Sequence, residues 1–191
     1  MGEENLKEHF SQWFDFFDCY TYSGNRVADR VNELIPDPLI VLDIGCGYNR
    51  LKGKIPNLIG CDIVNPEADI IMDMKDLPFM EGSIDCIIAL GSVNFYSREY
   101  VTSQIKFLSS LLKPNGHMIF RGNPGEYGIV QEDNLKLFEW SEDAINEIAD
   151  ELDFDVLALE KDYVNQQKLP EKYHQYKKDT SFRFYWEYQK K

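Results

Sequence analysis

The segment VLDIGCGYN, residues 41–49, constrains the fold more than any other part of the chain. Apolar residues run into Asp43, and Gly45 and Gly47 follow at once. The short apolar run over 39–44 is typical of a strand covered on both faces, as in a parallel sheet. The glycines carry no Cβ, so the backbone can come close to a ligand beside the Asp43 carboxylate. This segment therefore predicts a strand that ends in a ligand-binding turn.

The remaining apolar runs extend this strand into an open sheet. Strands are predicted over 57–63, 68–73, 83–90, 117–122, 154–164 and 181–189. Helices are predicted over 4–18, 27–35, 98–112 and 142–152, the last two capped by Ser97 and Ser141. The links between the first three strands are too short for regular crossover helices. We expect one α/β sheet of about seven strands, with the last strand antiparallel at the C-terminal edge and the early crossover helices shortened.

Length and charge limit the domain organisation and the partners. The 191 residues fit a single domain over 1–191, with a helical segment over 1–38 and an α/β core over 39–191. A formal net charge of −13 repels nucleic-acid phosphate at long range, so a nucleic-acid partner is not expected. No apolar run approaches the roughly 20 residues of a membrane span.

The four cysteines and three histidines share no metal-ligand spacing, so no metal site is expected. The cysteines lie in or near apolar runs, which favours buried free thiols. Free thiols persist in a reducing compartment, and we therefore expect a cytoplasmic location.

Two further acids narrow the choice of ligand at the glycine turn. The turn alone also fits a tight strand exit without a ligand. Arg50 breaks the G-x-G-x-x-G pattern, and no P-loop follows. Asp62, at the end of the second strand, can accept both hydroxyls of a ribose. Asp73, at the end of the third, lies within reach of an exocyclic amine. With Asp43, these carboxylates suit a ligand that has a cationic centre, a ribose and an adenine.

Five segments in order resemble the class I S-adenosylmethionine-dependent methyltransferases: VLDIGCG, IGCDI, DMKDLPF, GSIDCIIALGS and LLKPNGHMIF. The resemblance covers residues 39–122 and implies a Rossmann-like doubly wound sheet with S-adenosylmethionine as the cofactor. Asn49 stands where many members have a third glycine, but Asn tolerates left-handed backbone geometry.

The resemblance also implies a role for each matched position. Gly45 and Gly47 would line the methionine part of the cofactor, Asp62 would hold the ribose with Ile63 against the adenine, Asp73 and Met74 would meet the adenine edge, and Leu90 and Gly91 would supply backbone near the methionine amino group.

In this family the residues after the fourth strand face the transferred methyl group. Asn94 and Tyr96 are the catalytic candidates, because they can orient a substrate; a polar loop before a capped helix explains them equally well. Arg121, after the fifth strand, is expected to pair with a neighbouring acid, with a substrate carboxylate or phosphate as the alternative. Tyr20 and Tyr22 are expected to form a lid over the cofactor.

The expected function is methyl transfer to a small molecule or a protein side chain. Two alternatives remain: a regulatory or partner protein that binds S-adenosylmethionine without catalysis, and an enzyme of the aminopropyl transferase kind. The sequence leaves the acceptor and the oligomeric state open.

Overall fold

A computed structural model describes residues 3–11, 24–124, 136–163 and 182–191 of the chain. The helices are α1 (Glu3–Ser11), α2 (Gly24–Leu34), the 3-10 helix η2 (Met74–Asp76), α3 (Arg98–Leu111) and α4 (Glu142–Glu151). The strands are β1 (Val41–Ile44), β2 (Leu58–Asp62), β3 (Ile70–Ile71), β4 (Ile84–Leu90), β5 (Leu112–Gly122), β6 (Phe154–Tyr163) and β7 (Phe182–Lys190).

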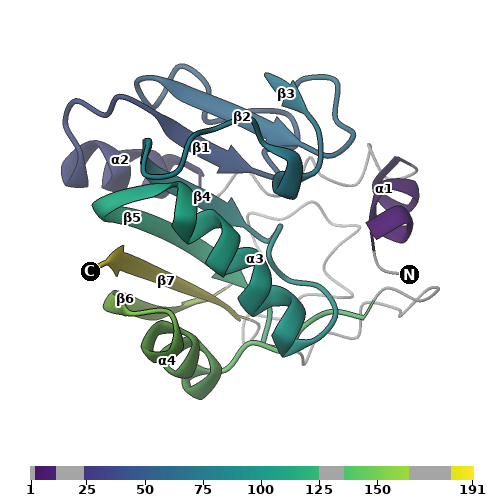
Figure 1. The fold of residues 1–191 in the computed structure, drawn as a ribbon, viewed down its shortest axis with the longest axis vertical. Coiled ribbons are helices and arrows are strands. Elements are labelled where there is room, and N and C mark those ends of the chain that lie inside the picture. Colours follow the sequence, from purple (N-terminus) through teal and green to yellow (C-terminus); the bar gives the residue numbers. More distant parts are fainter. Residues whose placement is uncertain (1–2, 12–23, 125–135, 164–181) are drawn as a thin grey trace.

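The strands form one sheet in the order β3-β2-β1-β4-β5-β7-β6 (Figure 1). Strands β1 to β5 pair in parallel, and β7 runs antiparallel to both β5 and β6. The predicted α/β sheet with an antiparallel last strand is confirmed, but β7 lies one place in from the edge and β6 forms the edge itself. The carboxyl ends of β1 to β5 meet along one side of the sheet, which we call the carboxyl edge.

The early crossovers are short, as the sequence predicts. Residues 45–57 and 63–69 contain turns and no helix. The third strand is much shorter than the predicted 68–73, because only Ile70–Ile71 pairs with β2. Within the described residues, α2 is therefore the helix that covers its face of the sheet.

Strand β5 starts earlier than the predicted 117–122. Ile84 pairs with Leu112, and Cys86 pairs with His117, so the turn Lys113–Gly116 is an excursion within the ladder. These residues interrupt the regular pairing within β5.

The predicted helices are present where the structure describes them. The Ser97 and Ser141 side chains each accept a hydrogen bond from the backbone N–H three residues later, which confirms both N-caps. For the helix predicted over 4–18, the described part ends at Ser11, and residues 12–18 lie outside the described ranges.

Two apolar layers cover the sheet. Helices α3 and α4 pack on one face around a buried aromatic group, in which the rings of Phe120 and Trp186 stack with centroids 5.1 Å apart and Trp140 lies 4.5 Å from Trp186. Helix α2 packs on the other face, where Val31 joins Tyr185 of β7. Both faces of the sheet are thus covered, so the groups that can meet a ligand lie at the strand ends and in the loops.

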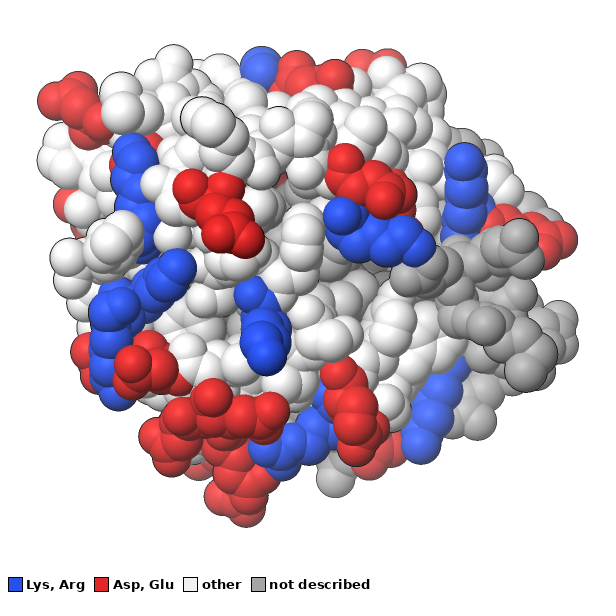
Figure 2. All heavy atoms as spheres, viewed as in Figure 1, with Lys and Arg blue, Asp and Glu red and all other residues white. Residues whose placement is uncertain are grey.

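Charges of both signs are interspersed on the face shown in Figure 2. Among the described residues, Lys113 pairs with Asp85 at 2.5 Å and Lys52 pairs with Asp69 at 2.8 Å. Within the described ranges, no helix is long and apolar enough to cross a membrane.

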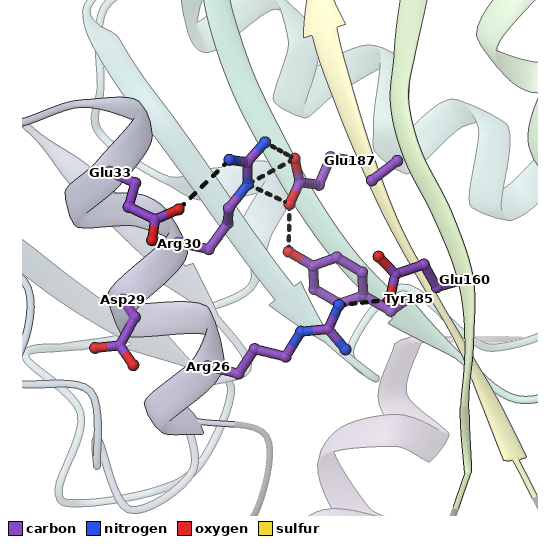
Figure 3. Close-up of a pocket in the computed structure, with 8 residues that line it drawn as sticks. Arg26, Asp29, Arg30, Glu33, Glu160, Tyr185 and Glu187 are labelled. Carbon is purple, nitrogen blue, oxygen red and sulfur yellow. Dashed lines mark hydrogen bonds and ion pairs between the residues drawn. The ribbon is translucent and has the colours of Figure 1, made fainter.

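A charged network fastens α2 to β6 and β7 (Figure 3). Arg30 binds the Glu187 carboxylate through two nitrogens, with both shortest distances at 2.8 Å. The Tyr185 hydroxyl donates to the same carboxylate at 2.5 Å. Arg26 pairs with Glu160 at 2.5 Å. Because the Glu187 side chain is only 2% exposed, Arg30 must remain beside it to offset the buried charge.

We predict that Glu187→Ala lowers the free energy of unfolding by about 2 kcal/mol, because it removes the hydrogen bonds from Arg30 and the acceptor of the Tyr185 hydroxyl. Glu33→Ala is the matched control, since Glu33 contacts the same Arg30 at 3.7 Å but is 70% exposed. The control should change stability by less than about 0.5 kcal/mol in urea unfolding. Equal effects of the two variants would contradict the role given to the buried pair.

Candidate functional site

The glycine turn after β1 is held close to its neighbours. Gly45 and Gly47 have φ values of 69° and 52°, and Asn49 adopts φ 52°, so the left-handed geometry expected of Asn49 is confirmed. The N–H groups of Gly45 and Cys46 both donate to the Cys61 carbonyl, at 2.8 and 3.0 Å. A Cβ on Gly45 would lie 2.5 Å from the Cβ of Ser92. Gly45 is therefore needed for the close approach between this turn and the loop after β4.

Two other glycines at the carboxyl edge face open space. Gly47 follows β1 and Gly91 follows β4, and a Cβ built on either meets no atom within 4 Å. Gly91 has φ 105°, a conformation that side-chain-bearing residues rarely adopt. The backbone is thus bare at two neighbouring strand ends. This is the kind of cradle that a ligand needs when it contacts main-chain atoms directly.

Asp62 joins the ends of β1 and β2. One carboxylate oxygen accepts from the N–H of Gly47 at 3.0 Å, and the other accepts from Val64 and Asn65, both at 2.9 Å. A carboxylate offers roughly four lone-pair directions, so about one remains for a ligand while these bonds persist. Ile63 is half-buried beside it. The sequence did not reveal that Asp62 also holds the glycine turn.

Asp73 lies beyond β3, at the start of η2. Its side chain accepts from the N–H of Lys75 at 3.1 Å, which caps this short helix. Burial raises the pKa of Tyr100 on α3, and the Asp73 charge raises it further. Met74 is half-buried and packs on the core. Asp73 and Met74 therefore stand between β3 and α3, one strand farther out than Asp62.

Asp43 is buried, with 5% of its surface exposed. The pKa of its carboxyl is raised to about 7: burial raises it most, the Asp62 charge also raises it, and the Arg121 guanidinium lowers it. Arg121 is also only 5% exposed. Its charge acts on Asp43, while the expected pairing of Arg121 with a neighbouring acid stays a prediction.

Burial also raises the pKa of the nearby Cys46 and Cys61 thiols, the latter to about 12, so both stay protonated at neutral pH. The described cysteines are free, and Cys61 and Cys86 are buried, as predicted. Cys19 lies outside the described residues. No group of three or more His, Cys, Asp or Glu side chains in the described ranges is arranged to hold a metal ion.

Asn94 and Tyr96 occupy different environments after β4. Asn94 is 2% exposed; its side-chain oxygen accepts from the N–H of Asn123 at 3.2 Å, and its carbonyl accepts from Phe138 at 2.9 Å. Asn94 thus joins the loop after β4 to both described ends of the connection between β5 and α4, a role that its sequence position does not reveal. Tyr96 is half-buried with φ 69°, which is unusual for a bulky residue and marks a constrained position. Its N–H donates to Lys136 at 2.6 Å.

The remaining predicted positions fit the same edge. Leu90 ends β4, is half-buried and pairs with Arg121 in the ladder. The ring of Phe10 on α1 meets the ring of Phe95 edge-on, with centroids 5.6 Å apart, and Figure 1 shows α1 on the side where β1, β2 and β4 end. The proposed lid residues, Tyr20 and Tyr22, lie outside the described ranges.

A hollow of about 500 Å³ lies elsewhere, between α2 and the outer strands (Figure 3). None of the predicted cofactor positions lines it. Its charged walls include the pairs Arg26–Glu160 and Arg30–Glu187, which already bind each other. The chemistry expected from the sequence therefore belongs to the carboxyl edge and not to this hollow.

Comparisons with known proteins agree with this geometry. Residues 42–120 match the family described as "Methyltransferase domain". Human "Probable tRNA methyltransferase 9B" is 28% identical over 117 residues, which cover 54% of this chain and 25% of the relative. Rat "Arginine-hydroxylase NDUFAF5, mitochondrial" is 30% identical over 111 residues, which cover 49% and 31%. The chain thus spans about a quarter to a third of the length of these relatives.

A solved structure shares the fold over nearly the whole chain. It is the 1,6-didemethyltoxoflavin-N1-methyltransferase of Burkholderia thailandensis, with a TM-score of 0.70 and 15% identity over 97% of this chain and 87% of the other. This enzyme and the chain therefore share the same fold.

We predict that Asp43→Asn stabilises the protein more at pH 8 than at pH 5. Because the folded-state pKa is raised from 3.8 to about 7, stability from this group is full below pH 3.8 and is lost as the pH rises through about 7. The neutral amide avoids that loss. The gain should grow on the order of 2 kcal/mol between the two pH values in urea unfolding. An equal gain at both would show that Asp43 ionises normally in the folded chain.

Proposed function

Because the chain belongs to the class I S-adenosylmethionine-dependent methyltransferase family, we propose that it binds S-adenosylmethionine at the carboxyl edge and transfers its methyl group. The observation that carries the proposal is the hydrogen bond from the Gly47 N–H to the Asp62 carboxylate, at strand ends where Gly47 and Gly91 face open space. A carboxylate next to bare backbone suits a ribose and its attached chain. The toxoflavin enzyme named above holds S-adenosylhomocysteine in its structure, which supports the same ligand here.

Each part of the cofactor would contact residues at a different strand end. Asp62 would bind the ribose with its remaining lone pair, and Ile63 would lie against the adenine. Asp73 and Met74 would meet the adenine edge near α3. Gly45, Gly47, Leu90 and Gly91 would line the methionine part, with the negative charge of Asp43 beneath it.

When bound, S-adenosylmethionine supplies a methyl group on a positively charged sulfur, which is already a good leaving group. The protein then has to align the acceptor and exclude water. We assign the alignment to Tyr96, which lies at a constrained backbone position, and to Asn94, which holds the surrounding loops together. A general base is needed only if the acceptor must lose a proton.

We propose a small molecule or a protein side chain as the acceptor, because a net charge of −13 and interspersed surface charges disfavour a polyanion (Figure 2). A tRNA acceptor is the second candidate, favoured by the name of the human relative. The alternatives to methyl transfer are binding without catalysis and another use of the adenosyl group, such as aminopropyl transfer. The cytoplasmic location and the single domain over 1–191 likewise stay proposals.

The experiment is calorimetric titration with S-adenosylmethionine, followed by methyl-transfer assays on separate metabolite, protein and tRNA pools. We expect binding, and turnover on the metabolite or protein pool. Turnover on tRNA alone, weakened by salt, would replace the first acceptor class by the second. Binding without turnover on any pool would favour the non-catalytic alternative, and no binding would overturn the proposal.

We predict that Gly47→Asn weakens S-adenosylmethionine binding at least tenfold, because the new side chain enters the cradle. Gly53→Asn is the matched control. Gly53 also has positive φ and open space around its Cβ position, but it lies in the link between β1 and β2, near Asn57. Asn tolerates left-handed backbone geometry, so both variants should fold. Calorimetry on both decides the point, and equal affinities would remove Gly47 from the site.

A further inference from the structure

We propose that Arg121 is a positioning residue: its buried guanidinium favours the charged form of the Asp43 carboxylate beneath the cofactor, so that the site accepts a cation at neutral pH. This inference rests on the proposed function and deepens it. S-adenosylmethionine carries a sulfonium and an ammonium group, and the charge of Asp43 is useful to them only while the carboxyl is ionised.

Strand register places the two groups on one face of the sheet. Asp43 pairs with Ile88 of β4, and Ile88 pairs with Ile119 of β5. Arg121 lies two residues beyond Ile119, and side chains two apart on a strand share a face. Ile88 and Ile119 belong to the core under α2, so Asp43 and Arg121 lie on that side. A long arginine side chain one step nearer the carboxyl edge can reach across β4 toward Asp43.

Both groups are 95% buried, so water does little to support either charge. The groups acting on the Asp43 carboxyl are its own burial, the Asp62 charge from β2 and the Arg121 charge from β5. The Cys46, Cys61 and Cys86 thiols also feel the Asp43 charge, and burial keeps all three neutral. Burial and Asp62 both oppose ionisation of Asp43, and Arg121 alone among these groups favours it.

The two arginines of α2 on this face serve other acids (Figure 3). Arg30 binds Glu187 at 2.8 Å, and Arg26 pairs with Glu160 at 2.5 Å while lying over the Tyr185 ring. Tyr185 is the ladder partner of Arg121 on β7. The arginines of α2 thus satisfy the carboxylates of β6 and β7, and Arg121 remains the cation that acts on Asp43.

The experiment compares Arg121→Met and Arg121→Lys with wild type, and uses Arg26→Met as a control that removes a nearby guanidinium outside the site. S-adenosylmethionine affinity is measured by calorimetry from pH 6 to pH 9. In wild type it should fall as the pH drops through the range where Asp43 takes up a proton. Arg121→Met should move this midpoint up by about one pH unit and weaken binding about tenfold at pH 7, with recovery at pH 9. Arg121→Lys should restore most of the wild-type profile, and Arg26→Met should leave the midpoint in place.

A second measurement needs no cofactor. The pH at which Asp43→Asn begins to stabilise the protein in urea marks the ionisation of Asp43 in the unfolded chain, and the pH at which the gain levels off marks its ionisation in the folded chain. Added to Arg121→Met, Asp43→Asn should show a gain that levels off at higher pH. This readout also applies if Arg121→Met lowers overall stability.

Each other outcome contradicts the inference in its own way. A loss of affinity that is equal at every pH would mean that Arg121 binds the cofactor directly. An unmoved midpoint with a lower stability would mean that Arg121 only packs. A wild type that binds no cofactor at any pH would overturn both proposals, whereas normal binding with an unmoved midpoint would overturn this one alone.

Discussion

The carboxylate of Asp62 is the contact on which the arrangement of the edge depends. It accepts three backbone N–H groups, one of them from Gly47 on the neighbouring strand end. A regular crossover helix would otherwise fix the turn after β1, but here the link to β2 contains only turns. The carboxylate and the Cys61 carbonyl take over that role. The Asp62 side chain therefore holds the turn after β1 in place, and it would also bind the ligand there.

The short crossovers also have a consequence for the sheet face that α2 covers. Within the described ranges a single helix covers that face, and the network around Glu187 fastens it. A buried charge without a partner is costly, so the Arg30–Glu187 pair fixes the position of α2. The same face carries Asp43 and Arg121, whose burial places charge inside the sheet. Burial of the Asp43 charge lowers stability, but this charge suits a cationic ligand.

Local patterns predicted most of the elements. Helical spacing and serine caps identified α3 and α4, and the apolar runs identified β1, β2 and β4. The left-handed geometry of Asn49 followed from its side chain. Such features depend on residues near in sequence, and they agree with one another along the central part of the chain.

Features that depend on distant residues could not be predicted. The Arg30–Glu187 and Arg26–Glu160 pairs join residues more than a hundred positions apart, and no spacing rule announces them. The place of β7 between β5 and β6 likewise follows from packing of the whole sheet. Asn94 looked like a catalytic candidate because it follows β4, yet its buried amide oxygen binds the loop after β5. Its part in catalysis stays a proposal.

Diffraction from crystals grown with S-adenosylhomocysteine would test the central claim most directly. The account predicts the ribose against Asp62, the amino acid chain over Gly47 and Gly91, and the adenine toward Asp73 and Met74. A ligand seated in the hollow beside α2, or strand ends that bind none, would contradict it.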